Sequence, residues 1–92
     1  MAANFRVSTK AFSNHSTALQ LFGDFDASSA CELINVLDDR IKTSDNVAID
    51  TDGLKTINAF GLDVFLPRML KLKYTRADIE VTGRFKDAFR EE

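Results

Sequence analysis

The sequence is poor in the residues that build disulfides, metal centres and membrane spans. Its 92 residues include one cysteine, Cys31, and one histidine, His15, so a disulfide within the chain and a cysteine-rich metal framework are excluded. No apolar run approaches the ~20 residues that span a bilayer, and no basic start precedes an apolar core like that of a signal peptide. The single thiol is compatible with a reducing compartment. We therefore expect a soluble, cytoplasmic protein that does not insert into membranes.

Neither sign of charge dominates. The formal net charge is -2 and the isoelectric point is about 5.3, so the chain exerts no broad attraction on phosphate backbones. We expect no nucleic-acid partner. Because 45% of the residues are hydrophobic, the chain can bury one small core, and residues 1–92 are predicted to form a single domain.

The first half of the chain changes from an alternating to a helical period. Apolar residues predict short strands at residues 5–7 and 18–22, joined by a polar turn as an antiparallel pair. Asp26 is predicted to cap a helix that ends near residues 43–46. The apolar segment 47–49 then predicts a strand in the middle of a sheet. A helix between two strands favours a parallel pair.

The second half repeats this order. Asn58 is predicted to cap a second helix, in which Pro67 should produce a kink or local irregularity. Residues 79–81 alternate like a last strand, and a short closing helix is expected after Gly83. The predicted fold class is α/β, a mixed four-stranded sheet with helices packed on it. The eight phenylalanines mostly suit core positions, with Phe60 the exception.

The strongest enzyme-like signal is the apolar strand that ends in Asp50-Thr51-Asp52-Gly53. It resembles the first motif of haloacid-dehalogenase-type phosphotransferases, in which paired carboxylates and a magnesium ion transfer phosphate. We favour the interpretation that both aspartates end the strand and Gly53 forms a turn, because such enzymes need further carboxylates, a lysine and a lid. A dyad of His15 and Cys31 lacks an orienting partner, so a turn histidine and a half-buried thiol are expected.

Three segments, Leu21–Ala30, Val47–Asp50 and Ile57–Leu62, together resemble the STAS domain family, named for sulphate transporters and anti-sigma factor antagonists. The likeness extends from about Phe5 to Arg84. It implies a single STAS-like domain that works by binding another protein, without catalysis, cofactor or metal.

The family's second motif resembles Asp-Ser-Ser-Gly-Leu or Asp-Thr-Ser-Gly-Leu at a helix start, where a partner kinase phosphorylates a hydroxyl. In this sequence Asn58, Ala59 and Phe60 occupy the first three positions, and only Gly61 and Leu62 match. Neither alanine nor phenylalanine can accept phosphate, so the usual switch is predicted to be absent. Asn58 can still cap the helix, and Gly61 permits close approach of another backbone.

Two threonines before the motif, Thr51 and Thr56, are alternative phosphate acceptors. The only basis for this suggestion is that they lie near the motif in the sequence. Phe60 either anchors an interface or turns inward to extend the core, and the sequence leaves both open.

The resemblance implies a bacterial regulator of transcription whose partner is an anti-sigma factor or a related switch kinase. The alternative is a subunit of a transport-associated complex, or its nucleotide- or lipid-binding component. The sequence also leaves a homo-oligomer open. The predicted partner-binding residues are Gly23, Asp24, Asp26, Asn58, Ala59, Phe60, Gly61 and Leu62.

Overall fold

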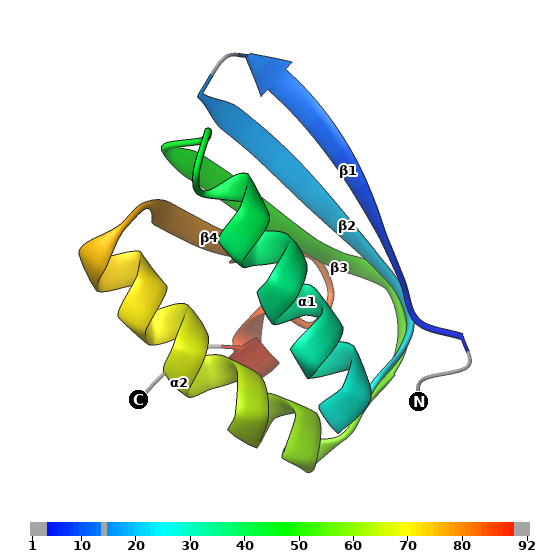
Figure 1. The fold of residues 1–92 in the computed structure, drawn as a ribbon. Coiled ribbons are helices and arrows are strands. Elements are labelled where there is room, and N and C mark those ends of the chain that lie inside the picture. The colour runs from blue at the N-terminus through cyan, green and yellow to red at the C-terminus, as the bar shows by residue number, and fades with distance from the viewer. Residues whose placement is uncertain (1–3, 14, 90–92) are drawn as a thin grey trace.

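Four strands form one mixed sheet in the order β1-β2-β3-β4 (Figure 1). The computed structural model describes residues 4–13 and 15–89. β1 pairs with β2 antiparallel, whereas β2 with β3 and β3 with β4 are parallel pairs, which confirms the predicted α/β fold class and both predicted pairings. The strands are β1 (Arg6–Ser13), β2 (Ser16–Phe25), β3 (Asn46–Ile57) and β4 (Asp78–Thr82).

Two long helices pack on one face of this sheet. α1 (Ala27–Arg40) connects β2 to β3, and α2 (Ala59–Thr75) connects β3 to β4. A 3-10 turn, η1 (Lys86–Phe89), closes the described chain. Figure 1 shows α1 and α2 in front of the same side of the sheet. β2 accordingly buries every second residue, because alternate side chains point toward the helices.

The predicted turn at Asp52 and Gly53 is wrong, because β3 continues through both residues to Ile57. Pairing of β3 with β4 ends where Asp50 meets Thr82, and β3 then goes on beside β2 alone. The β2–β3 register shifts at this point, so that Phe22 lies opposite Gly53. A Cβ at Gly53 would lie 2.5 Å from the backbone carbonyl oxygen of Leu21 and 2.5 Å from the Phe22 ring, so the irregularity needs glycine.

Pro67 does not end α2, which is continuous from Ala59 to Thr75. Pro67 cannot donate to the carbonyl of Asp63, four residues earlier. Both residues are exposed, so water can bond that carbonyl. The hydrogen bond that the proline removes is therefore on the solvent side of the helix, where water can replace it.

The core lies between the helices and the sheet and is centred on Phe25, which is fully buried. Its ring makes edge contacts with the rings of Phe5, Phe65 and Phe89, at centroid distances of 6.0, 5.9 and 5.1 Å. Phe12 departs from the predicted core pattern, because its side chain is 69% exposed.

We predict that Phe25→Ala lowers the free energy of unfolding by about 3–5 kcal/mol, because it removes the ring that the other three contact. Urea unfolding followed by circular dichroism measures this. Phe60→Ala is the matched control, since that ring is 72% exposed and its loss should change stability by no more than about 0.5 kcal/mol. Equal effects of the two substitutions would contradict the assignment of the core.

Candidate functional site

The two central strands end side by side, and each is followed at once by a helix. Phe25 and Ile57, the last residues of β2 and β3, are register partners. The backbone N–H of Asn58 donates to the carbonyl oxygen of Phe25 at 2.8 Å. The first turns of α1 and α2 therefore lie together at the carboxyl edge of the parallel pair. We call the surface made by residues 23–26 and 58–62 the paired helix start.

Asp26 caps α1, as predicted. Its Oδ1 accepts a hydrogen bond from the backbone N–H of Ser29 at 2.9 Å and from the Ser29 hydroxyl at 3.1 Å. The Ser29 hydroxyl also lies 2.6 Å from the carbonyl oxygen of Asp24, to which it donates. The bond from the Ser29 N–H holds the pKa of Asp26 below its ordinary value of 3.8. The capping carboxylate is thus ionised at neutral pH.

Asp24 joins three segments of the chain. Its Oδ1 accepts from the Thr56 hydroxyl at 2.8 Å, and its Oδ2 accepts from the side-chain amide of Asn4 at 3.3 Å. The adjacent Gly23 has φ of +92°, and a Cβ there would lie 2.0 Å from the carbonyl oxygen of Asn4. Gly23 therefore shapes this surface through its backbone.

Thr51 and Thr56 both lie in β3, and only Thr56 is exposed. The Thr51 side chain is fully buried, and its hydroxyl donates to the carbonyl oxygen of Thr82 at 2.7 Å. The suggestion that Thr51 can accept phosphate is wrong for this folded state, because no kinase can reach the oxygen. The Thr56 hydroxyl is accessible and is bonded to a carboxylate.

Asn58 caps α2, as predicted, because its Oδ1 accepts from the backbone N–H of Phe60 at 2.8 Å. Gly61 makes the predicted close approach, and the backbone it meets is that of Asp26. A Cβ on Gly61 would lie 2.8 Å from the Asp26 carbonyl oxygen. Gly61 is buried at this contact, and because it has no side chain the two helix starts can pack directly against each other. Leu62 is half-buried against the core.

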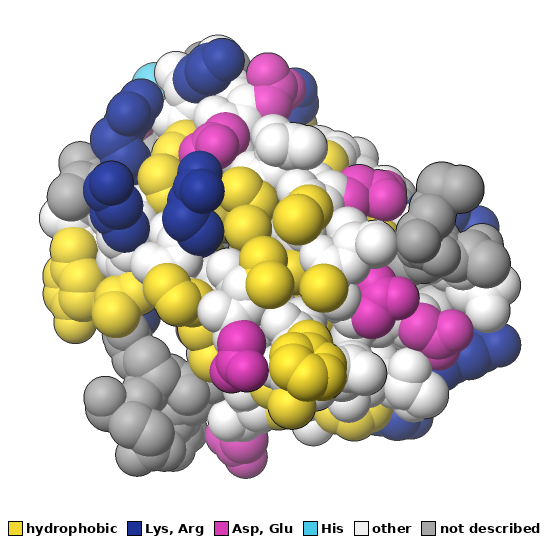
Figure 2. All heavy atoms as spheres, turned by 60° about the horizontal axis from the view of Figure 1, so that its bottom comes forward, with side chains coloured by type: hydrophobic (Ala, Val, Ile, Leu, Met, Phe, Trp, Pro, Cys, Tyr) yellow, Lys and Arg dark blue, Asp and Glu magenta, His cyan; other side chains and the backbone are white. Residues whose placement is uncertain are grey.

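Phe60 points to solvent and is 72% exposed, so the alternative in which it extends the core is wrong. Val64, one turn further along α2, is 37% exposed. The end of the molecule where both helices begin comes forward in Figure 2, which shows hydrophobic side chains gathered across this face and acidic ones among them and beside them. Exposed apolar groups of this kind commonly mark protein-binding surfaces.

The Asp50–Asp52 motif holds the turn before η1. Asp52 Oδ1 accepts from the backbone N–H of Arg84 at 2.8 Å, and the Thr51 hydroxyl accepts from that of Phe85 at 3.0 Å. Asp50 Oδ1 accepts from the N–H of Asp52 at 2.9 Å. Within residues 4–13 and 15–89, no three His, Cys, Asp or Glu side chains gather as a metal site would require.

His15 and Cys31 have separate surroundings. His15 Nδ1 lies 3.5 Å from Asp45 Oδ2 at the surface. Cys31 is exposed on α1, so the expected half-buried thiol is wrong. In the described part of the chain, no helix is long and apolar enough to cross a membrane.

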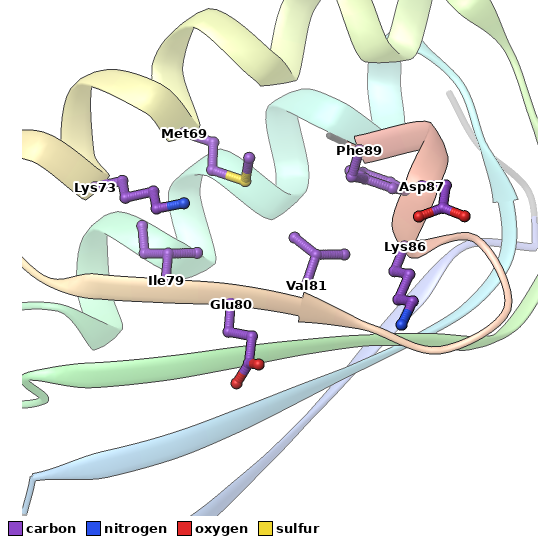
Figure 3. A pocket seen from close by; sticks show the side chains of 8 residues that line it. All are labelled: Met69, Lys73, Ile79, Glu80, Val81, Lys86, Asp87 and Phe89. Atoms are coloured by element: carbon purple, nitrogen blue, oxygen red, sulfur yellow. The ribbon is translucent and has the colours of Figure 1, made fainter. Parts of the chain in front are cut away.

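A cavity of about 660 Å³ opens between α2, β4 and η1. In Figure 3, the side chains of Met69, Ile79 and Val81 point into the space between α2 and β4, whereas Glu80 points to the other side of the sheet. Sequence reasoning missed this cavity. The alternation at residues 79–81 indicates the strand face, but the position of η1 depends on the tertiary fold. The remaining residues that line the cavity are Lys73, Lys86, Asp87 and Phe89.

No family model matches the sequence, and no curated protein matches it. Solved structures do share its fold. The anti-sigma factor antagonist SpoIIAA in its unphosphorylated form is 14% identical over 83% of this chain and 71% of that chain, with a TM-score of 0.64. An antisigma-factor antagonist STAS domain from Rhodobacter sphaeroides is 18% identical over 97% of this chain and 95% of that chain, with a TM-score of 0.68.

The native form of Mglu is also similar, at 14% identity and a TM-score of 0.71, although the match spans 82% of this chain and only 23% of that chain. The fold is therefore STAS-like, and the resemblance found in the sequence is confirmed at the level of the fold.

Asp26→Asn is expected to remove one pH-dependent part of the stability, because asparagine still caps the helix but does not titrate. The pKa of Asp26 is lowered below 3.8 in the folded state, so its ionised form stabilises the fold above that pH. This stabilisation is lost as pH falls through the lowered pKa. Urea unfolding of wild type and Asp26→Asn, from neutral pH down to the lowered pKa of Asp26, should show the two free energies of unfolding converging as pH falls. A difference that stays constant with pH would contradict the assigned role.

Proposed function

We propose that this chain is a non-enzymatic protein-interaction domain of the anti-sigma factor antagonist kind, and that it binds a regulatory partner through the paired helix start. The STAS-like fold supports the class of function. The partner would be an anti-sigma factor or a related switch kinase in a bacterial cytoplasm. Binding would regulate transcription by sequestering or releasing that partner.

The observation that carries the proposal is the exposure of Phe60 at the start of α2. An aromatic ring that is 72% exposed on a rigid first turn can bury a large area at little entropic cost. The turn is rigid because the Asn58 side chain caps it and Gly61 packs on the backbone of Asp26. We assign Phe60 as the anchor, with Asp26 at the adjoining helix start, where its backbone meets Gly61.

The same position explains why the usual phosphorylation would not operate. In the family's motif, phosphate adds negative charge at this helix start and disrupts the interface. Ala59 and Phe60 offer no hydroxyl, so the contact would not be switched there. Thr56 has a hydroxyl, but phosphate on it would stand next to Asp24, which accepts its hydrogen bond. We infer that control of binding, where it exists, acts on the partner.

We predict that Phe60→Ala weakens partner binding by more than ~1 kcal/mol without unfolding the domain. Wild type and Phe60→Asp are first compared in pull-downs from native lysate, and isothermal titration with the retained kinase then measures Phe60→Ala. Tyr74→Ala is the matched control, because Tyr74 is an aromatic residue 75% exposed near the other end of α2. Equal affinity of wild type and Phe60→Ala would contradict the proposed anchor.

The cavity between α2, β4 and η1 favours one second candidate, a nucleotide- or lipid-binding component of a transport-associated complex. Met69, Ile79 and Val81 offer apolar surface. At the edge of the cavity, Lys73 and Lys86 offer two positive charges against the one negative charge of Asp87. This combination suits an anion with an apolar body.

If this second candidate is right, ATP or palmitate should bind saturably in equilibrium dialysis, and Lys73→Glu should weaken that binding several-fold through charge repulsion. Lys71→Glu is the control, because Lys71 is exposed on the same helix and does not line the cavity. Absence of binding by both ligands, or equal loss in both variants, would reject the ligand-binding role.

A further inference from the structure

The sheet has one face that no helix covers among residues 4–13 and 15–89. Both α1 and α2 lie on the other side (Figure 1). The strand register aligns Lys10, Ala18, Ala48 and Glu80 in one line across the uncovered face, one residue from each strand. The two alanines are half-buried, whereas the lysine and the glutamate at the ends of the line are exposed.

The two outer strands of this face carry charges of opposite sign. Arg6 and Lys10 lie on β1, and both are exposed. Asp78 and Glu80 lie on β4 at the opposite edge and are exposed as well. One edge of the face is therefore basic and the other acidic. Ala18 and Ala48 lie between them on the central line, and the half-buried Asp50 lies two residues further along β3.

This division is self-complementary under a two-fold rotation. Consider two copies that meet face to face about a two-fold axis parallel to the strands. β1 of each copy then lies opposite β4 of the other, and residues that are register partners within one sheet stay at the same height along the strands in both copies. Lys10 then faces Glu80 of the second copy, and the same pair forms again by symmetry. Ala18 faces Ala48 of the second copy, and these small side chains let the two sheets approach to about 10 Å.

Phe12 adds a second, independent feature. Its side chain is 69% exposed on β1 and borders a hollow of about 330 Å³ on the uncovered face. Asn46, Ala48, Asp78 and Glu80 line the other side of this hollow. In the two-fold arrangement, Phe12 of the second copy arrives at the β4 edge, level with Asp78, and can enter the hollow. An exposed aromatic and a place to bury it thus occur on the same face.

We propose that the uncovered sheet face is a docking surface for a second copy of this chain, with reciprocal Lys10–Glu80 pairs and with Phe12 of each copy in the hollow of the other. The four strands, of 8, 10, 12 and 5 residues, span roughly 550 Å² in projection. Stable interfaces commonly bury ~800 Å² on each partner, so the dimer is weak and reversible. Its charge pairs make it weaker at high salt.

Sedimentation velocity across the micromolar to millimolar range tests the proposal with a charge exchange. Lys10→Glu alone places two glutamates opposite each other in each pair, and Glu80→Lys alone places two lysines there, so each variant should be monomeric. An equimolar mixture restores both pairs with opposite charges. The mixture should dimerise with a dissociation constant at least roughly tenfold below that of either variant alone.

The matched controls are Lys42→Glu and Glu32→Lys, which make the same charge changes at exposed positions on or just after α1, away from this face. Both should dimerise like the wild type, and so should Phe60→Ala, whereas Phe12→Ala should dimerise more weakly. Circular dichroism checks that every variant is folded. A wild type that stays monomeric, or a mixture that associates no better than its components, overturns the proposal. Neither result bears on the paired helix start.

Discussion

The parallel pairing of β2 with β3 is the interaction on which the rest of this structure depends. Parallel strands end at the same edge of a sheet, and here each is followed within two residues by a helix. The bond from the Asn58 N–H to the Phe25 carbonyl joins the two ends. Asp26 and Asn58 can therefore cap neighbouring helices, and the paired helix start exists because this pairing places them together.

Close backbone contacts at two glycines help to shape that surface. Gly23 lets the segment at Asn4 pass, and Gly61 lets α2 rest on the backbone of Asp26. A surface built in this way tolerates exchange of the residues that project from it. Under the proposed function, this explains how the hydroxyls of the family's motif can be replaced by Ala59 and Phe60 while the binding surface keeps its shape.

The two proposed interaction surfaces have separate anchors, because Phe60 projects from α2, whereas Lys10, Phe12 and Glu80 lie on the face without helices. The paired helix start lies at the carboxyl edge of β2 and β3, on the helical layer. The proposed self-association surface lies on the face without helices, and its distinguishing property is the division of charge between β1 and β4. A copy docked there would leave Phe60 exposed, so self-association and partner binding can occur together.

The sequence by itself determined the order of elements, both N-caps and the antiparallel and parallel pairings, because these follow from local hydrogen-bonding chemistry and hydrophobic period. The STAS-like fold was expected only from the resemblance of three segments to that family. It could not determine the course of β3 through Gly53, since that glycine is required by the close approach of Leu21 and Phe22 on a strand distant in sequence. It assigned Phe12 to the core, which is wrong, and left Phe60 open between core and solvent, because both rings are equally apolar. Only the tertiary structure decided their exposure, since burial depends on which faces the packed helices cover.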